Sequence, residues 1–136
     1  MHTCVLVADD RDIYEALDRF TNYDDEEPKP DSRWDYFGIG GRFEGALVLK
    51  QPRRLRQFFG LLPAGHTSRV SVAKKSEIDQ EALLADPPAA LFFAEHLYEC
   101  PLLADGETLA RWHAEFRERF SEVPDETTLQ IVDAHS

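Results

Sequence analysis

The feature that most constrains the fold is an amphipathic stripe near the C-terminal end of the chain. Four large apolar side chains recur at three- and four-residue spacing: Leu109, Trp112, Phe116 and Phe120. This spacing places side chains on one face of an α-helix. Residues 105–108 are typical of a helix start, and Pro124 ends the pattern. The stripe needs an apolar surface to pack on, so we expect the helix to lie against a sheet.

β-branched, apolar segments near both ends of the chain predict buried strands. They are Thr3–Ala8 and Thr128–Asp133. Asp10 or Asp12 can cap a helix after the first strand, where apolar residues recur from Ile13 to Phe20. A further strand is expected over 69–73 and a further helix over 76–85.

The middle of the chain predicts a hairpin. Residues 34–39 form the first expected strand, Gly40-Gly41 the turn or bulge, and residues 43–49 the returning strand. Residues 51–62 could hold a short helix after Pro52. Residues 89–100 fit either a helix or a hairpin that turns at Glu95-His96, and we favour the hairpin.

These elements predict one α+β domain over residues 1–136. The sheet is expected to be mixed or antiparallel with helices packed on one face, and a ferredoxin-like (split β-α-β) arrangement is the architecture that we favour. The length of 136 residues suits a single domain. We find no internal repeat, low-complexity tract or linker that would divide it.

The charge balance limits the partners of the chain. Lys and Arg number 15 against 26 Asp and Glu, so the net charge is -11. Phosphate repulsion argues against broad binding to nucleic acid, and the same repulsion argues against anionic membranes. No apolar stretch approaches the roughly 20 residues of a membrane span. The net charge is compatible with a basic protein partner, with a cation or with a local basic pocket. It is also compatible with a role in solubility alone.

The cysteines and the first residues of the chain predict where in the cell the protein is located. Cys4 and Cys100 make no disulfide framework, so we expect two reduced, buried thiols and a cytoplasmic location. The first residues lack the basic flank and apolar block of a secretory signal. Four adjacent acids, Asp24–Glu27, stand in an expected exposed loop. A calcium site there is conceivable, but the spacing does not match an EF-hand loop.

The run from Trp34 to Phe43 concentrates the residues that could carry a function. Trp34 and Tyr36 alternate with smaller or charged residues, and three glycines stand within positions 38–41. Glycine amides beside Arg42 can form an anion-binding concavity, because the guanidinium and the amides both donate to carboxylate or phosphate. The run matches neither common phosphate-binding loop. A tight hairpin with a core Trp, in which Arg42 pairs with Asp35 or Glu44, is the alternative.

A second constellation is Asp133-x-His135 near the end of the chain. Two residues apart on a strand, both side chains project from one face. They could act as an acid–base pair or bind a metal, although two ligands alone make no metal site. Asp9 or Asp10 could join them if the first and last strands are neighbours. A polar strand end in solvent is the alternative.

The segment 31–45 resembles the signature of a family of small, uncharacterised bacterial and bacteriophage proteins, which runs approximately K-W-D-W-Y-x-I-G-G-R-W-x-G. Residues 23–26, 73–79 and 124–135 resemble the family as well. The chain has Phe37 or Phe43 where the family commonly has Trp, and Ala134 where a terminal D-C-H has Cys. The family has no established activity. The resemblance therefore implies a functional run without naming its function, and it adds Asp133 and His135 to the residues to test.

Two functions follow from these residues. In the first, the protein binds a small anionic ligand and could be an enzyme. The site then has three parts: Gly40, Gly41 and Arg42 hold the anion, Trp34 and Tyr36 wall the pocket, and Asp35, Asp133 and His135 supply acid–base chemistry. In the second, an acidic phage- or defence-type accessory protein binds a basic protein partner. The residues name no cofactor, and we assign no metal site.

Overall fold

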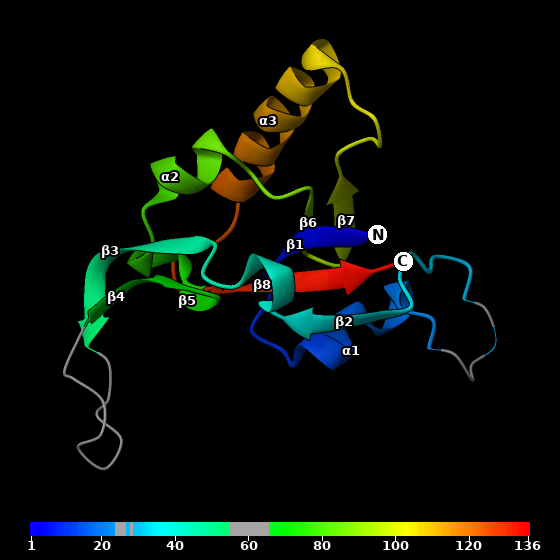
Figure 1. The fold of residues 1–136 in the computed structure, drawn as a ribbon, viewed down its shortest axis with the longest axis horizontal. Coiled ribbons are helices and arrows are strands. Elements are labelled where there is room, and N and C mark those ends of the chain that lie inside the picture. The colour runs from blue at the N-terminus through cyan, green and yellow to red at the C-terminus, as the bar shows by residue number, and fades with distance from the viewer. Residues whose placement is uncertain (24–26, 28, 55–65) are drawn as a thin grey trace.

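The computed structural model describes residues 1–23, 27, 29–54 and 66–136, and a mixed six-stranded sheet forms the centre of this described part (Figure 1). The sheet strands are β1 (His2–Ala8), β2 (Tyr36–Ile39), β5 (Val72–Lys74), β6 (Ala90–Phe93), β7 (His96–Glu99) and β8 (Thr128–His135). Their order is β2-β8-β1-β6-β7, and β5 pairs with the first half of β8 on the side where β2 pairs with the second half. The predicted α+β class is confirmed.

The expected split β-α-β unit is present at the start of the chain. β1 and β2 are each antiparallel to β8, which lies between them, so β1 and β2 run in the same direction. The helix α1 (Ile13–Leu17), extended by a 3-10 turn over Asp18–Phe20, connects the two strands. Asp12 caps α1, because its side chain accepts a hydrogen bond from the Tyr14 amide. β6 joins the other side of β1 in parallel.

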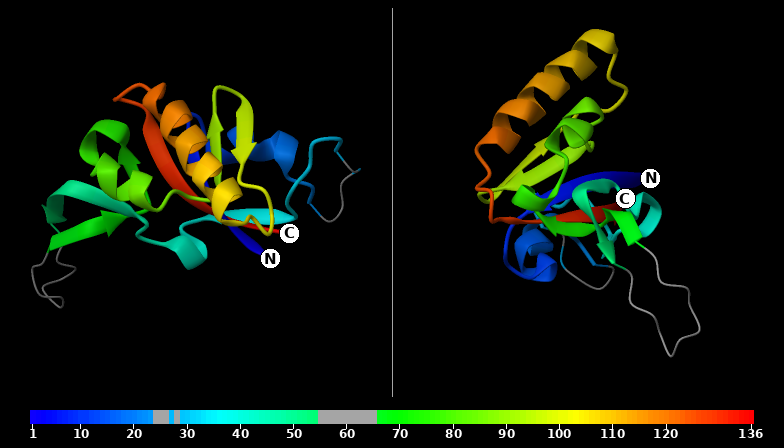
Figure 2. Two further views of the ribbon diagram at one scale, coloured as in Figure 1. Left: turned by 90° about the horizontal axis from the view of Figure 1, so that it is seen from above. Right: turned by 90° about the vertical axis from the view of Figure 1, so that its left-hand side faces the viewer.

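Helices cover both faces of the sheet. α2 (Gln80–Ala85) and α3 (Gly106–Ser121) lie over one face and α1 over the other (Figure 2). Packing on one face had been expected. The difference arises because alternate residues of the central strands are apolar on both sides. Leu6 and Ile131 pack under α3, whereas Val5 and Val132 pack against α1.

The predicted stripe forms the buried face of α3. Trp112, Phe116 and Phe120 are almost fully buried, whereas Leu109 is 44% exposed one turn from the start of the helix. The Asp105 side chain accepts from the Thr108 amide and fixes that start. The described residues contain no helix that is long and apolar enough to cross a membrane.

The predicted central hairpin is wrong. β2 pairs with β8, while β3 (Leu47–Arg54) pairs with β4 (His66–Val70) in a separate two-stranded sheet. A 3-10 turn over Gly41–Phe43 redirects the chain between β2 and β3. Phe37 of β2 gains its burial from the α1 core, which a hairpin with β3 would not supply.

Several boundaries also differ from the predictions. Residues 51–54 belong to β3 instead of a helix, with Pro52 inside a register shift, and residues 55–65 lie outside the described part. The expected strand over 69–73 is divided between β4 and β5. A 3-10 turn, Lys75–Glu77, precedes α2. The favoured hairpin over 89–100 is confirmed, but it turns at Ala94-Glu95, where both φ angles are positive.

Candidate functional site

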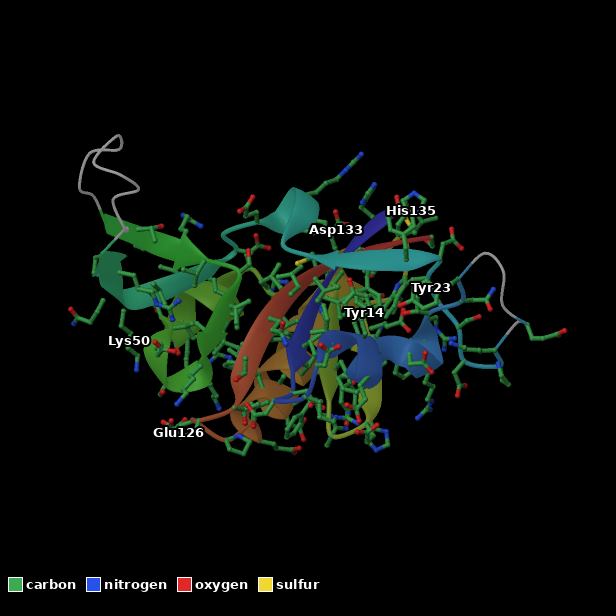
Figure 3. The ribbon with its side chains drawn as sticks, turned by 90° about the horizontal axis from the view of Figure 1, so that it is seen from below. Tyr14, Tyr23, Lys50, Glu126, Asp133 and His135 are labelled. Carbon is green, nitrogen blue, oxygen red and sulfur yellow. The ribbon has the colours of Figure 1, made fainter. Side chains whose placement is uncertain are left out.

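The site lies where the last strand ends beside the start of the first. The antiparallel register places His2 opposite His135 and Cys4 opposite Asp133, while Tyr36 of β2 lies opposite His135 on the other side. Residues that are directly opposite project from the same face of a sheet. Figure 1 shows the two chain ends close together, and Figure 3 shows Asp133 and His135 along the end of β8. The predicted shared face of Asp133 and His135 therefore also carries His2 and Tyr36.

Asp133 and His2 form a carboxylate–imidazole pair. His2 Nδ1 lies 2.7 Å from Asp133 Oδ1, and the Arg42 amide donates to Asp133 Oδ2 at 3.0 Å. Burial opposes ionisation of Asp133, but the Arg42 amide and His2 together hold the pKa of its carboxyl below the ordinary value. An ionised Asp133 accepts from Nδ1–H of His2. The other ring nitrogen, Nε2, is then the one left for proton exchange.

The glycine turn holds this carboxylate in place. Gly41 has a φ of 52°, and a Cβ at this position would stand 2.5 Å from Asp133 Oδ2. Gly40 has a φ of 74°, and its amide donates to the Ile131 carbonyl at 2.8 Å. The sequence predicted an anion-binding concavity at these glycines. In the structure the glycine turn instead places the Arg42 amide against the chain's own Asp133, while the Gly40 amide bonds the Ile131 carbonyl.

Arg42 offers its guanidinium to solvent next to this pair. The side chain is exposed, and within the described part of the chain the guanidinium makes no hydrogen bond or ion pair. It therefore pairs with neither Asp35 nor Glu44 there, as the architectural alternative had required. The backbone of Arg42 positions Asp133, and its exposed charge also helps to lower the pKa of that carboxyl.

His135 is the second imidazole of the site. It stacks on Tyr36, with ring centroids 4.7 Å apart and planes 9° apart, and contacts His2 edge to face at 4.9 Å. Its Nδ1 is buried, lies 3.7 Å from Asp35 Oδ2 and has no hydrogen-bond partner. Two imidazoles are thus in contact, each facing its own carboxylate. The His2 and His135 side chains keep 22% and 30% of their surface exposed.

Trp34 takes part in the core and in a cavity wall. It is 4% exposed, and its ring centroid lies 6.2 Å from that of Phe20 in the core on the α1 side. Trp34 and His2 also line one cavity of about 420 Å³. The sequence predicted Trp34 and Tyr36 as walls of one ligand pocket with Arg42, but of these three residues this cavity includes Trp34 alone.

Cys4 lies beside the site, but its thiol is poorly suited to act as a nucleophile. Burial, with a smaller contribution from the charges of Asp133 and Asp86, raises the pKa of the Cys4 thiol to about 12. A thiol with such a pKa is protonated at neutral pH. Cys4 and Cys100 are both free, as the sequence predicted, but both are half-buried where buried thiols had been expected.

The expected contribution of Asp9 or Asp10 is wrong, and His2 occupies the place that they were to fill. The terminal strands are neighbours, but they are antiparallel, so Asp10 lies at the far end of β8 and accepts from the Thr128 amide at 2.8 Å. Asp9 pairs with Arg11. The signal that could have found His2 is its position at the start of a strand, which antiparallel pairing brings to the end of β8.

The described residues hold no group of three or more His, Cys, Asp and Glu side chains that could bind a metal ion. The two imidazoles instead lie in pairs with carboxylates, His2 hydrogen-bonded to Asp133 and His135 Nδ1 3.7 Å from Asp35 Oδ2, an arrangement that is typical of acid–base groups. The acidic loop, where a calcium site was considered, lies largely outside the described residues, since 24–26 and 28 are not among them.

Comparison of the chain with protein-family models, with curated proteins and with solved structures gives no match in any of the three.

Proposed function

We propose that the protein binds a small anionic molecule at His2, His135 and Arg42, and that the two imidazoles exchange protons with it. The observation that carries this proposal is the contact between two partly exposed imidazoles, each of which faces a separate carboxylate. The core of a fold needs no such arrangement. Buried polar groups that serve stability are usually fully hydrogen-bonded, whereas His135 Nδ1 has no hydrogen-bond partner.

Two adjacent imidazoles allow proton transfer in both directions. Asp133 fixes His2 with Nδ1 protonated, so His2 Nε2 can accept a proton from a ligand hydroxyl or from water. His135, whose Nδ1 lies 3.7 Å from Asp35 Oδ2, can donate a proton to a leaving group.

The preference for an anion rests on Arg42. Its guanidinium is exposed and has no partner within the described residues, although the net charge of the whole chain is -11. A cationic ligand would be drawn to many places on such a surface, so an unpaired arginine beside two imidazoles is better explained by a carboxylate or phosphate ligand. Its planar donors suit either group.

The test is a titration of the isotope-labelled protein with inorganic phosphate, followed by NMR at the imidazole ring protons. The chain has 5 histidines, and His2→Asn and His135→Asn variants assign the two site rings. We expect both rings to shift on titration, and Arg42→Gln to weaken binding several-fold. His96→Asn, at the exposed start of β7, is the matched control and should leave binding unchanged. Site rings that do not respond while His96 does would overturn the proposal.

The alternative, an acidic accessory protein that binds a basic partner, rests on the net charge and on the acids at 24–27. It stays a prediction, as does the relation to bacteriophage proteins. A pull-down with a basic protein bait at low and high salt separates it from the first proposal. Salt-sensitive capture that His2→Asn and His135→Asn leave intact would favour it.

A further inference from the structure

We infer that the ligand is amphiphilic: an anionic head group bound by Arg42 and the two imidazoles carries an apolar group that fills the cavity beside His2. This inference rests on the proposed function and names the chemical class of its ligand. The ligand would be a small carboxylate or phosphate that bears an aromatic or branched aliphatic substituent.

The cavity is large enough for such a substituent. It lies between the first residues of β1 and the segment Cys100–Leu102 that follows β7, and its volume of about 420 Å³ falls within the range of small-molecule pockets, roughly 300–1,000 Å³. Its wall is held by the Cys100 amide, which donates to the Ala89 carbonyl at 2.8 Å. β6 begins opposite Val5, so the first residues of β1 extend past it and leave this space open.

The lining of the cavity is mainly apolar. Seven of its twelve lining residues are apolar when the two free cysteines are counted: Met1, Cys4, Trp34, Phe43, Ala89, Cys100 and Leu102. Arg33 and Glu99 also line it, but Arg33 Nε lies 3.1 Å from Glu99 Oε1, so their charges largely offset each other. A charged group would lose hydration here without gaining a free partner, whereas an apolar group gains contacts.

His2 connects the cavity to the proton-transfer site. Its ring lines the cavity, contacts His135 at 4.9 Å and is hydrogen-bonded to Asp133. A ligand whose apolar group occupies the cavity therefore brings its next atoms to His2. The binding energy of the apolar group positions the reactive part of the ligand, although that group takes no part in the chemistry.

The rim of the cavity offers a matched pair of test positions. Leu102 lines the cavity and is 76% exposed, while the next residue, Leu103, is fully exposed and does not line it. Leu103 has a φ of 55°, a conformation that aspartate tolerates better than leucine. Leu102→Asp and Leu103→Asp therefore add the same charge to the same loop, and only the first removes apolar surface from the cavity.

The experiment compares three probes on the full chain by NMR: 1-naphthyl phosphate, 1-naphthoate and inorganic phosphate. We expect both naphthyl anions to bind at least about tenfold more tightly than inorganic phosphate. Leu102→Asp should weaken the naphthyl anions about tenfold and leave inorganic phosphate nearly unchanged. Leu103→Asp should change neither by more than about twofold, because its effect on a distant anion is screened.

Each outcome separates this inference from the proposed function. If inorganic phosphate and the naphthyl anions bind equally and both shift His2 and His135, the anion site stands and the apolar subsite is wrong. If a naphthyl anion shifts the amides of Cys100 and Leu102 without shifting the two imidazoles, the cavity binds apolar groups but the proposed function fails. Equal effects of Leu102→Asp and Leu103→Asp would also overturn the inference.

Discussion

Polar side chains lie among apolar neighbours near both ends of β8, but their hydrogen bonding differs between the two ends. At the Thr128 end, Lys75 is 5% exposed, and its Nζ donates to the carbonyls of Phe120 and Val123 at 2.9 and 2.7 Å. Both carbonyls lie where α3 ends, and the Phe120 carbonyl also accepts from the Val123 amide at 3.1 Å. At the other end, His135 Nδ1 is buried without a hydrogen bond. Complete pairing marks the end that stabilises the fold, and incomplete pairing marks the end that we propose to act on a ligand.

The largest expected effect is at the fully paired end. Lys75→Met keeps the apolar stem but leaves the buried Val123 carbonyl without a donor and removes a charged donor from the Phe120 carbonyl, so we expect the free energy of unfolding to fall by about 3 kcal/mol. Urea denaturation measures the loss. Lys74→Met is the control, because Lys74 is exposed and its side chain pairs with Glu126 at the surface. If both variants unfold at the same urea concentration, Lys75 does not anchor α3.

The Lys75→Met variant also tests how separate the two ends are. The ring signals of His2 and His135 should be unchanged in the folded variant, since the imidazoles lie beyond the α3 core at the other end of β8. A large shift of either ring would show that the ends are coupled, and the comparison between them would lose its basis.

The next effect is at the glycine turn. Gly41→Ala should lower the free energy of unfolding by about 2 kcal/mol, because φ is 52° and the new Cβ would collide with Asp133. The collision also displaces the carboxylate, so the His2 ring signals should move. Gly38→Ala is a close control: a Cβ there meets no atom within 4 Å. If Gly41→Ala destabilises the chain but His2 does not respond, the turn does not position Asp133.

The same contrast explains what the sequence could predict. Local patterns in the sequence predict strands β1 and β8 and helix α3. Local patterns also indicate the helix caps Asp12 and Asp105. Strand pairing is not local. β2 was assigned to a hairpin with the next strand, although its partner is β8, whose paired residues lie 93 to 99 positions later.

The site depended on the same non-local information. Asp133 and His135 could be placed on one face from their spacing alone. The choice between His2 and Asp9 or Asp10 as their neighbour needed the direction of β1 relative to β8. Predicting the role of the glycines also required knowledge of strand pairing, because Gly41 contacts Asp133 only when β2 lies beside β8.

A smaller effect is expected from the charge of Asp133. Its pKa lies below the ordinary value of 3.8, so the folded chain resists protonation more than the unfolded chain does. The stability that Asp133 contributes is therefore complete above about pH 4 and is lost as the pH falls through the folded-state pKa. Asp133→Asn should cost about 1 kcal/mol at pH 6, because the amide keeps an acceptor but loses the charge.

This dependence is measured by chemical denaturation of both proteins across pH 2–6 (these bounds are roughly those of carboxyl titration). The difference between the wild type and Asp133→Asn should shrink as the solution becomes acidic. Asp105→Asn is a useful comparison, since its pKa is also lowered, by the Thr108 amide at the start of α3. It should show a similar pH trend without altering the His2 ring. A difference for Asp133→Asn that is constant with pH would contradict an ionised Asp133.

The smallest effect is at Tyr36, whose ring stacks on His135 while the residue stays 52% exposed. Tyr36→Leu removes the stacking but keeps apolar bulk, so we expect a loss of about 0.5 kcal/mol. The ring protons of His135 should move downfield, because a tyrosine ring no longer shields them. Tyr14→Leu is the control: Tyr14 is 60% exposed, and its ring lies 5.0 Å from Phe37 on the α1 side. If the two variants affect His135 equally, the stack does not orient the second imidazole, and Asp35 alone would have to do so.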